Sequence, residues 1–308
     1  MKSLAVLLAA VCCLVLTNSA FGFREPDRPV LPNFDKRQQR QADLPQEKKN
    51  AVGKLKQRLP QARIDFDEIV GAPRHIHGGD RFLTGPNAQG GAVPPTATQS
   101  FANDPHRATK AFLKEHRGLF GHGAEALEKA RVTREFAGDH NKLKTVVWQQ
   151  EHEGIPVFEA VLISHTTDHE ELVSVSSQFV PDPMKSAKAG GPNSSQPKLK
   201  VEQAIAAAAE NVGEILSPAD VEAITQSKGD ERKQKFKAKR LLDETDTRLV
   251  WLPTSEDQMQ LCWEIILTAA ARSEMFRLLV DTQTGEVLVR QCLTEYISDA
   301  TYRVYTSD

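Results

Sequence analysis

A helix followed by three apolar strands with short connections occurs twice along this sequence, and this repetition constrains the fold more than any other feature. In the first copy, Asp104 is a good N-cap, Pro105 suits the first helical position and Gly118 ends the apolar helical face. Strand-like runs follow at residues 144–150, 155–165 and 171–180. Because short connections are typical of antiparallel hairpins, this copy predicts a helix packed on an antiparallel meander.

The second copy starts with apolar residues at helical spacing over residues 201–212. A polar stretch follows over residues 226–240. Strands are then predicted at residues 248–252, 260–269, 274–280 and 286–296, the last one after a tight turn. The sequence therefore predicts an α+β protein of two tandem modules, each a helix packed on an antiparallel β-meander.

Changes in composition divide the 308 residues further. Residues 23–99 contain few apolar side chains, so we expect an extended polar segment with a weak helix over 50–59 and one strand over 64–70. The predicted divisions are a signal peptide 1–22, the extended segment 23–99, a first module 100–182, a linker 183–197, a second module 198–297, and residues 298–308 as the start of a linker to a missing region.

The first residues have the pattern of a cleaved secretory signal. Lys2 precedes an uncharged apolar run over residues 4–16, and Ala20 and Gly22 offer small residues for cleavage after either of them. A run of about 13 residues is too short to cross a bilayer. We therefore expect a secreted protein, periplasmic or extracellular, without a stable membrane anchor.

Secretion also bears on the cysteines, because Cys12 and Cys13 would leave with the signal peptide. The remaining Cys262 and Cys292 both lie in predicted strands. In an oxidising compartment these two residues can form a disulfide, and two separately buried thiols are the equal alternative.

Charge excludes one class of partner. The 39 Lys and Arg residues balance 41 Asp and Glu residues, so no overall basic field would draw the chain to nucleic acid. The cations of the polar stretch are Lys228, Arg232, Lys233, Lys235, Lys237, Lys239 and Arg240. A solvated loop or helix face explains this basic run, and an electrostatic docking patch for an acidic partner is the alternative.

Two groups of histidines have spacings that a metal site could use. His165 and His169 have the spacing of a helical zinc site, but Thr166 stands where a metalloprotease needs Glu, and a hairpin turn is predicted there. A solvated polar turn is therefore the favoured interpretation of this segment.

His75 and His77 would share one face of a strand, with Asp80 nearby, as a weak metal site or as ordinary polar packing. The sequence contains neither Gly-x-Ser-x-Gly nor His-Glu-x-x-His. We therefore expect no catalytic, cofactor-binding or metal-binding residues in this chain, and no enzyme activity.

The strand with Trp148 is followed by a hairpin turn and the run Gly154-Ile155-Pro156-Val157-Phe158. Together these residues of segment 145–180 resemble the fungalysin/thermolysin propeptide (FTP) motif of zinc metalloprotease prosegments. The second module resembles a PepSY domain through its helix over 201–212, its Trp263-Glu264-Ile265 strand and its hairpin over 281–287. The two resemblances imply a cystatin-like or PepSY-like fold for each module.

Physical roles within the fold account for the residues of the FTP-like run. Gly154 permits the positive φ of a tight turn. Pro156 lacks an amide donor and belongs on an edge strand or at a bulge. Trp148 and Phe158 are large aromatic residues that we expect to be buried against the helix. These roles are structural, and none of them is catalytic.

The resemblance implies a function through a partner. Prosegments of this family assist the folding of a protease domain and keep it inactive until cleavage. The resemblance therefore implies a secreted protein that inhibits a thermolysin/fungalysin-type zinc metalloprotease domain and helps it to fold. That domain would be joined in cis or supplied in trans, and the zinc ion would belong to it alone. Because the chain lacks His-Glu-x-x-His, we expect the N-terminal part of a larger or truncated precursor. The alternative is a non-catalytic envelope or extracellular binding module.

Overall fold

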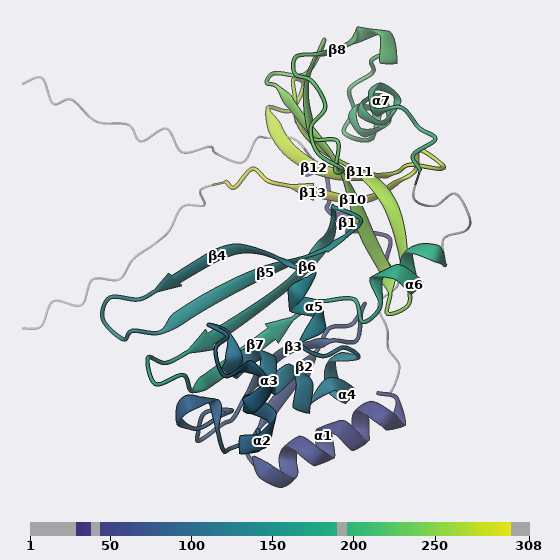
Figure 1. The fold of residues 1–308 in the computed structure, drawn as a ribbon. Helices are drawn as coiled ribbons and strands as arrows, with labels where there is room; N and C mark the ends of the chain where they lie inside the picture. Colours follow the sequence, from purple (N-terminus) through teal and green to yellow (C-terminus); the bar gives the residue numbers. More distant parts are fainter. Residues whose placement is uncertain (1–28, 38–43, 190–195, 297–308) are drawn as a thin grey trace, which may run out of the picture. The chain divides into compact units, whose positions relative to one another are not determined.

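Antiparallel pairing dominates the computed structural model, which describes residues 29–37, 44–189 and 196–296 (Figure 1). The predicted signal peptide, part of the linker and residues 298–308 lie outside the described residues. The strands are β1 (Phe34–Asp35), β2 (Arg63–Phe66), β3 (Pro73–His77), β4 (Arg131–Ala137), β5 (Lys144–His152), β6 (Ile155–Thr166), β7 (Leu172–Ser177), β8 (Val221–Ala223), β9 (Gln234–Ala238), β10 (Thr245–Ser255), β11 (Gln258–Ala269), β12 (Glu274–Asp281) and β13 (Val287–Cys292).

The helices are few and mostly short. They are α1 (Gln46–Arg58), α2 (Pro95–Thr98), α3 (Arg107–Glu115), α4 (Arg117–Phe120), α5 (Glu125–Glu128), α6 (Pro183–Lys188) and α7 (Val201–Asn211), with 3-10 turns η1 (Pro86–Ala88), η2 (Gln99–Phe101) and η3 (Pro218–Asp220). Among the described helices none is long and apolar enough to cross a bilayer.

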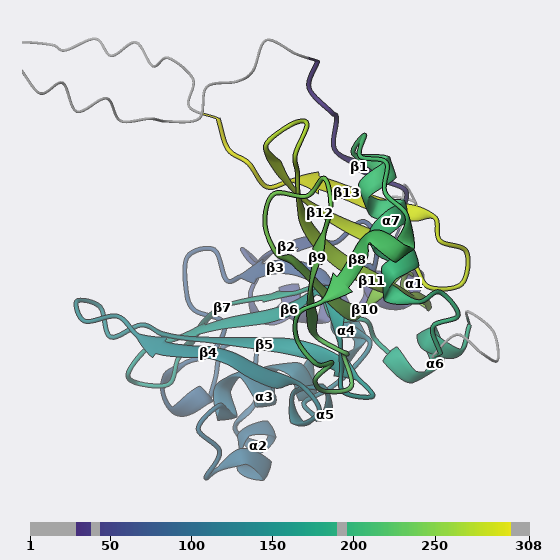
Figure 2. The ribbon, with the colours of Figure 1, turned by 90° about the horizontal axis from the view of Figure 1, so that it is seen from above.

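Six strands pair in the order β2-β3-β7-β6-β5-β4, and all neighbours in this set are antiparallel. Figure 2 shows β4 to β7 side by side. The strands β5, β6 and β7 correspond to the three runs of the first sequence copy. The helices α3 and α5 contact β7 and β5, and together with α1, α2 and α4 they lie on one side of this sheet in Figure 1.

The helix of the first sequence copy, α3 with its continuation α4, starts and ends later than its sequence predicts. The Asp104 carboxylate accepts a hydrogen bond from the His106 amide at 2.8 Å, which forms a turn before α3 rather than its cap. Helical structure continues past Gly118 into α4 and stops at Gly121, whose φ is +75°. A glycine with left-handed backbone is the usual helix terminator, so Gly121 takes the role expected of Gly118.

The remaining strands pair in the order β1-β13-β12-β11-β10-β9-β8, again antiparallel throughout. The helix α7 contacts β11, β12 and β13. The Trp263 indole, on β11, donates a hydrogen bond to the Leu199 carbonyl at 3.0 Å, immediately before α7 begins. The two antiparallel sets meet where β6 and β10 run parallel at the Val157–Trp251 pair. The protein is therefore an α+β fold with a large, mostly antiparallel sheet.

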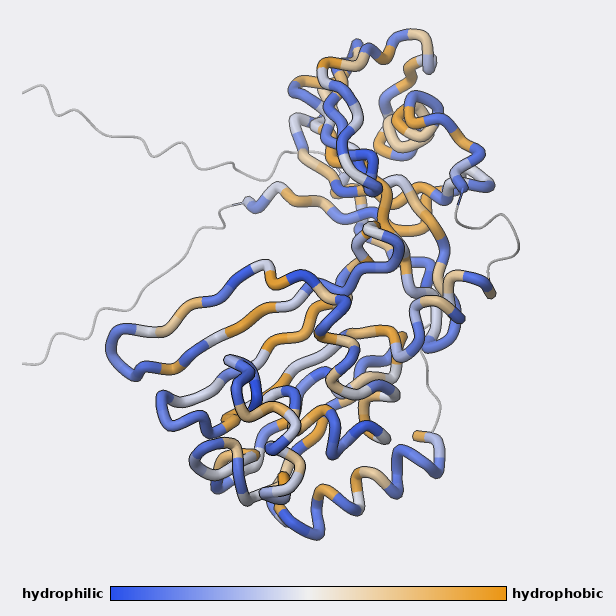
Figure 3. The backbone as a smooth tube through the Cα atoms, viewed as in Figure 1, coloured by the Kyte–Doolittle hydropathy of each residue, from blue (hydrophilic) through white to orange (hydrophobic). Residues whose placement is uncertain are grey.

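Residues 44–99 contain the helix and the strand predicted within them, as α1 and β2, but they are packed into the fold rather than extended. They form α1, β2 and β3, and β3 pairs with β7. Figure 3 shows α1 as mostly hydrophilic, yet its Leu55 is fully buried, as are Ile76 and Leu83 farther along the segment. The few apolar residues of this segment pack against a sheet built from later residues, a long-range contact that local apolar density does not indicate.

The polar stretch over 226–240 also differs from the loop or helix face predicted for it. Residues Gln234–Ala238 form β9, which pairs with β8 and β10. Phe236 is fully buried, whereas Lys237 is exposed, so the strand has the two-residue alternation of a sheet with one buried face. The high density of lysines hides this alternation in the sequence.

The short strand β1 pairs with the outer edge of β13, and the residues that follow it contact β6. Arg37 forms ion pairs with Asp35 at 2.6 Å and with Glu159 of β6 at 2.8 Å, and its guanidinium lies 5.6 Å from the centre of the Phe158 ring. The Arg37 side chain is almost completely buried. This residue therefore links the N-terminal segment to β6 through charge and an aromatic face.

Candidate functional site

The β5–β6 hairpin is the centre of the FTP-like segment, and its turn has an unusual backbone. Glu153 and Gly154 have φ values of +52° and +72°. Positive φ at both central residues is the signature of a type I′ hairpin turn. A Cβ atom on Gly154 would lie 2.2 Å from the Asp230 Oδ2 atom and 2.9 Å from its Cβ atom. Both the turn and the close approach of the loop before β9 therefore require glycine here.

We expect Gly154→Ala to lower the free energy of unfolding by about 2 kcal/mol, because a Cβ atom is disfavoured at positive φ and collides with Asp230. Urea unfolding followed by circular dichroism measures this change. Gly53→Ala is the matched control, since Gly53 lies in α1 with open space around it and should be neutral or stabilising. A Gly154→Ala variant as stable as the Gly53→Ala variant would contradict the prediction.

Trp148 and Phe158 belong to two different hydrophobic clusters. Trp148 is 2% exposed and packs edge-on against His106, just before α3, with 5.2 Å between the ring centres. Phe158 is buried among Val250, Leu252 and other residues of β10–β13. The expectation that Phe158 packs against the helix is therefore wrong, although the side chain is buried.

Irregularities in β6 explain the direction of Phe158. The pairing with β5 shifts between Gln149 and Glu151, and Pro156 lies opposite Glu151 directly after this bulge. The Gln149 side-chain amide donates hydrogen bonds to the carbonyls of Val157 at 2.7 Å and Ala160 at 3.2 Å. Glu159 then has a φ of +58°. Residues 157–160 of β6 thus bulge out of the pairing with β5, and Val157 pairs with Trp251 of β10.

The sheet face opposite the helices carries polar side chains together with the partly exposed Val147 and Ile163. His75 Nδ1 lies 3.0 Å from the Ser176 hydroxyl, and His165 Nδ1 lies 2.9 Å from the Thr145 hydroxyl. The rings of His75 and His77 are 5.4 Å apart. Burial, and next the nearby His75, lower the pKa of His165. In Figure 1 no described helix lies over this face.

The metal-site alternatives do not assemble. His165 lies on β6, whereas His169 is exposed in the following turn with Asp168 at 3.8 Å. Asp80, expected near His75 and His77, faces Arg81 at 3.5 Å. Within residues 29–37, 44–189 and 196–296 the structure has no group of three or more His, Cys, Asp or Glu side chains placed to hold a metal ion.

The two cysteines lie too far apart for a bond between them. Cys262 pairs with Asp281 of β12, whereas Cys292 pairs with Phe276 of the same strand. These β12 positions are five residues apart, which is roughly 16 Å along a strand. A disulfide needs Cα atoms within about 7 Å. The structure accordingly has two separate cysteines, with the Cys262 thiol buried and its pKa raised by that burial.

Strand β4 is a site feature that our sequence interpretation missed. All seven of its residues are exposed, and among the described strands it pairs only with β5. Val132 and Phe136 are 44% and 45% exposed, and the Arg134 guanidinium lies 4.7 Å from the centre of the Phe136 ring. The spacing of Val132 and Phe136 among charged residues was the available signal. An exposed edge strand of this kind can accept a strand from a partner.

A cavity of about 500 Å³ borders β4 near Ala137 and the start of α3. His106 lines it, with a pKa lowered by burial and then by the charge of Lys144. Lys144 forms an ion pair with Glu135 at 2.7 Å, and this hydrogen bond is the main cause of the lowered pKa of Glu135. Arg107 and Glu170, which also line the cavity, form a second ion pair.

Comparison with known proteins assigns this same segment to a family motif. The model for the Fungalysin/Thermolysin Propeptide Motif, FTP, matches residues 131–179, which span β4 to β7. Among solved structures, the Bacillus megaterium YpeB C-terminal domain matches with 14% sequence identity and a TM-score of 0.28, covering 83% of this chain and 100% of that domain. No curated protein matches the chain. Over β4 to β7, the protein is thus similar to the propeptide part of fungalysin and thermolysin precursors.

Proposed function

We propose that this protein is a secreted, non-catalytic prosegment that binds the catalytic domain of a thermolysin/fungalysin-type zinc metalloprotease, inhibits it and assists its folding. The observation that carries the proposal is the FTP motif over residues 131–179. In this proposal the motif forms one module, a PepSY-like module follows over 198–297, and zinc belongs to the partner. The protease domain is joined in the same precursor or supplied in trans.

The docking surface in this proposal is β4 together with the open sheet face beside it. The outer edge of β4 offers backbone donors and acceptors, and Val132 and Phe136 add exposed apolar area. Arg131, at the start of β4, forms an ion pair with Glu151 of β5 at 2.6 Å, and this pair fixes one end of the strand. A protease surface bound here would be held by strand pairing and by the aromatic ring, and access to its cleft would be blocked.

We expect the purified secreted chain to inhibit a thermolysin-like protease at micromolar or lower concentration and to raise its refolding yield after denaturation. Phe136→Asp should weaken inhibition at least about tenfold, because it places a charge in a centre of apolar contact. Ile215→Asp is the control, since Ile215 is 81% exposed and lies after α7, away from β4.

Inhibition constants and gel-filtration of the mixture provide the measurements for both variants. The absence of both inhibition and a complex at micromolar concentration would count against the proposal. A stable secreted chain that captures other partners and no protease would favour the binding-module alternative.

A further inference from the structure

The β8–β9 hairpin carries an excess of positive charge that its own ion pairs do not neutralise. Residues 228–240 contain seven cations and two acids in a chain of net charge -2. Lys235 pairs with Glu244 at 2.9 Å and Lys239 pairs with Asp220 at 3.0 Å. The other cations are exposed and form no ion pair with a described residue, namely Lys228, Arg232, Lys233, Lys237 and Arg240. Glu222 lies opposite Lys237 in the pairing of β8 with β9, and Arg240 acts electrostatically on Asp220. The basic surface that remains available to a partner is therefore formed by Lys228, Arg232 and Lys233, near the turn of the hairpin.

A small cavity lies beside this surface and concentrates the charge. Its volume is about 250 Å³, and Lys233, Arg248 and Arg277 line it together with Glu264 and Asp246. The Glu264 carboxylate is almost fully buried and pairs with both arginines, with Arg277 Nε at 3.2 Å. At this ion-pair distance the buried Arg277 Nε atom still makes no hydrogen bond, and both arginine side chains are partly exposed.

One carboxylate cannot use all the donors that surround it. Each guanidinium carries five N–H groups, so the two arginines around Glu264 keep donors in excess, and Lys233 adds an ammonium. A second carboxylate entering the cavity would receive charge-assisted hydrogen bonds, which are stronger than neutral ones. The negative charge of Asp246 does not cancel this excess of donors, because Asp246 is also shared with Lys235, whose ammonium lies 3.9 Å from its carboxylate.

The chemistry favours an acidic peptide over a nucleic acid. The aromatic residue of the basic stretch, Phe236, is fully buried, so it cannot stack on a base. The cavity has room for one side chain rather than for a larger ligand. The separate cations along the hairpin suit carboxylates spaced along a protein segment.

We propose that the β8–β9 hairpin and the adjoining cavity bind an acidic peptide segment, with one carboxylate held between Lys233, Arg248 and Arg277. This surface is formed by β8–β12 and is separate from the β4 surface of the proposed function. It therefore stands or falls independently of that function.

Fluorescence anisotropy with a labelled hexaglutamate peptide tests this proposal on the secreted chain. We expect micromolar binding at about 50 mM salt that weakens at least fivefold at about 200 mM salt, because the contacts are charged and exposed. Lys233→Glu and Arg277→Gln should each weaken binding at least about tenfold. Lys54→Glu, at an exposed lysine of α1, is the matched charge control and should change binding less than twofold.

Three results would overturn the proposal. Equal binding of a hexaglutamine peptide would remove the role of charge, and unchanged binding by Lys233→Glu would remove the site. Stronger competition by a single-stranded oligonucleotide than by unlabelled hexaglutamate would assign the surface to phosphates. Urea midpoints verify that Arg277→Gln is folded, and Lys233→Glu is surface-exposed and provides an independent test. Protease inhibition by a chain that fails to bind hexaglutamate would reject this inference alone.

Discussion

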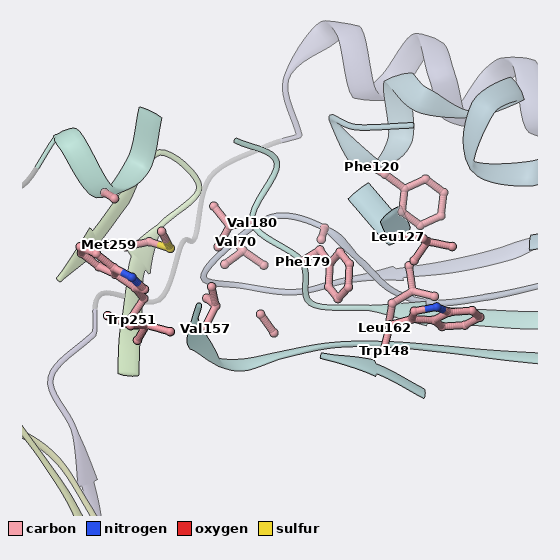
Figure 4. Close-up of a cluster of buried hydrophobic side chains, with 14 of the residues drawn as sticks. Val70, Phe120, Leu127, Trp148, Val157, Leu162, Phe179, Val180, Trp251 and Met259 are labelled. Atoms are coloured by element: carbon pink, nitrogen blue, oxygen red, sulfur yellow. The ribbon is translucent and has the colours of Figure 1, made fainter. Parts of the chain in front are cut away.

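Replacing Trp148 by alanine is expected to lower the free energy of unfolding by about 3–5 kcal/mol. The side chain is 2% exposed at the centre of β5, inside the FTP segment. Figure 4 shows its ring beside Leu127 and Leu162, and His106 packs edge-on against it at 5.2 Å. These neighbours come from the helix α5, the strand β6 and the turn before α3, so they cannot all move to fill the space left by the indole.

Urea unfolding monitored by far-ultraviolet circular dichroism measures this loss without relying on tryptophan fluorescence. Phe136→Ala is the matched control, because Phe136 is an aromatic residue on the adjacent strand but 45% exposed, and it should cost no more than about 1 kcal/mol. Trp148→Phe keeps a ring in the core and should give an intermediate loss if the alanine variant does not fold. A loss below about 1 kcal/mol for Trp148→Ala would show that the core is not organised around this residue.

The parts of the fold that could be predicted from the sequence are those specified by local pattern. The strands β5, β6 and β10 to β12 have apolar runs bounded by turns, and the turn residues at both ends of each run indicate where the strand begins and ends. The turn at Gly154 is predictable for the same reason, since a short glycine-containing connection between two strands favours positive φ.

Features that depend on distant partners could not be predicted in this way. The buried residues of 44–99 pack against strands that lie about a hundred residues later in the sequence, as Ile76 does against Val175. The low density of apolar residues in this segment therefore gave a misleading prediction. The direction of Phe158 depends on a bulge after Gln149 and on the positive φ of Glu159, which no residue preference signals. The separation of Cys262 and Cys292 depends on strand register, which is set by tertiary packing.

Of the candidate site, the sequence indicated the hairpin residues and the basic run but not the surfaces they belong to. The exposed edge at β4 was missed because its two apolar residues lie among charges. The cavity beside the basic hairpin joins Lys233 to Arg248 and Arg277, which lie on two other strands. Residues that are far apart in the sequence come together here because of the order of the strands in the sheet, and no short sequence motif indicates that order.

Acidification is expected to destabilise the protein, and His116 makes the best-defined contribution. Burial lowers the pKa of His116 to about 4, against a hydrogen bond to the Ala92 carbonyl at 3.1 Å that raises it. The unfolded chain binds a proton on this residue near pH 6.5. Between these two values the unfolded state holds more protons than the folded state, so stability falls as the pH falls.

The expected loss from His116 is about 2 kcal/mol between pH 7.5 and pH 5. Burial also lowers the pKa values of His106, His122, His152 and His165, so these residues act in the same direction. Urea unfolding at pH 7.5, 6 and 5 measures the slope. His116→Gln should remove about 2 kcal/mol of this pH dependence relative to the unsubstituted protein. An unchanged slope in His116→Gln would mean that the folded state admits the proton at His116, and that the turn between α3 and α4 opens more readily than its burial implies.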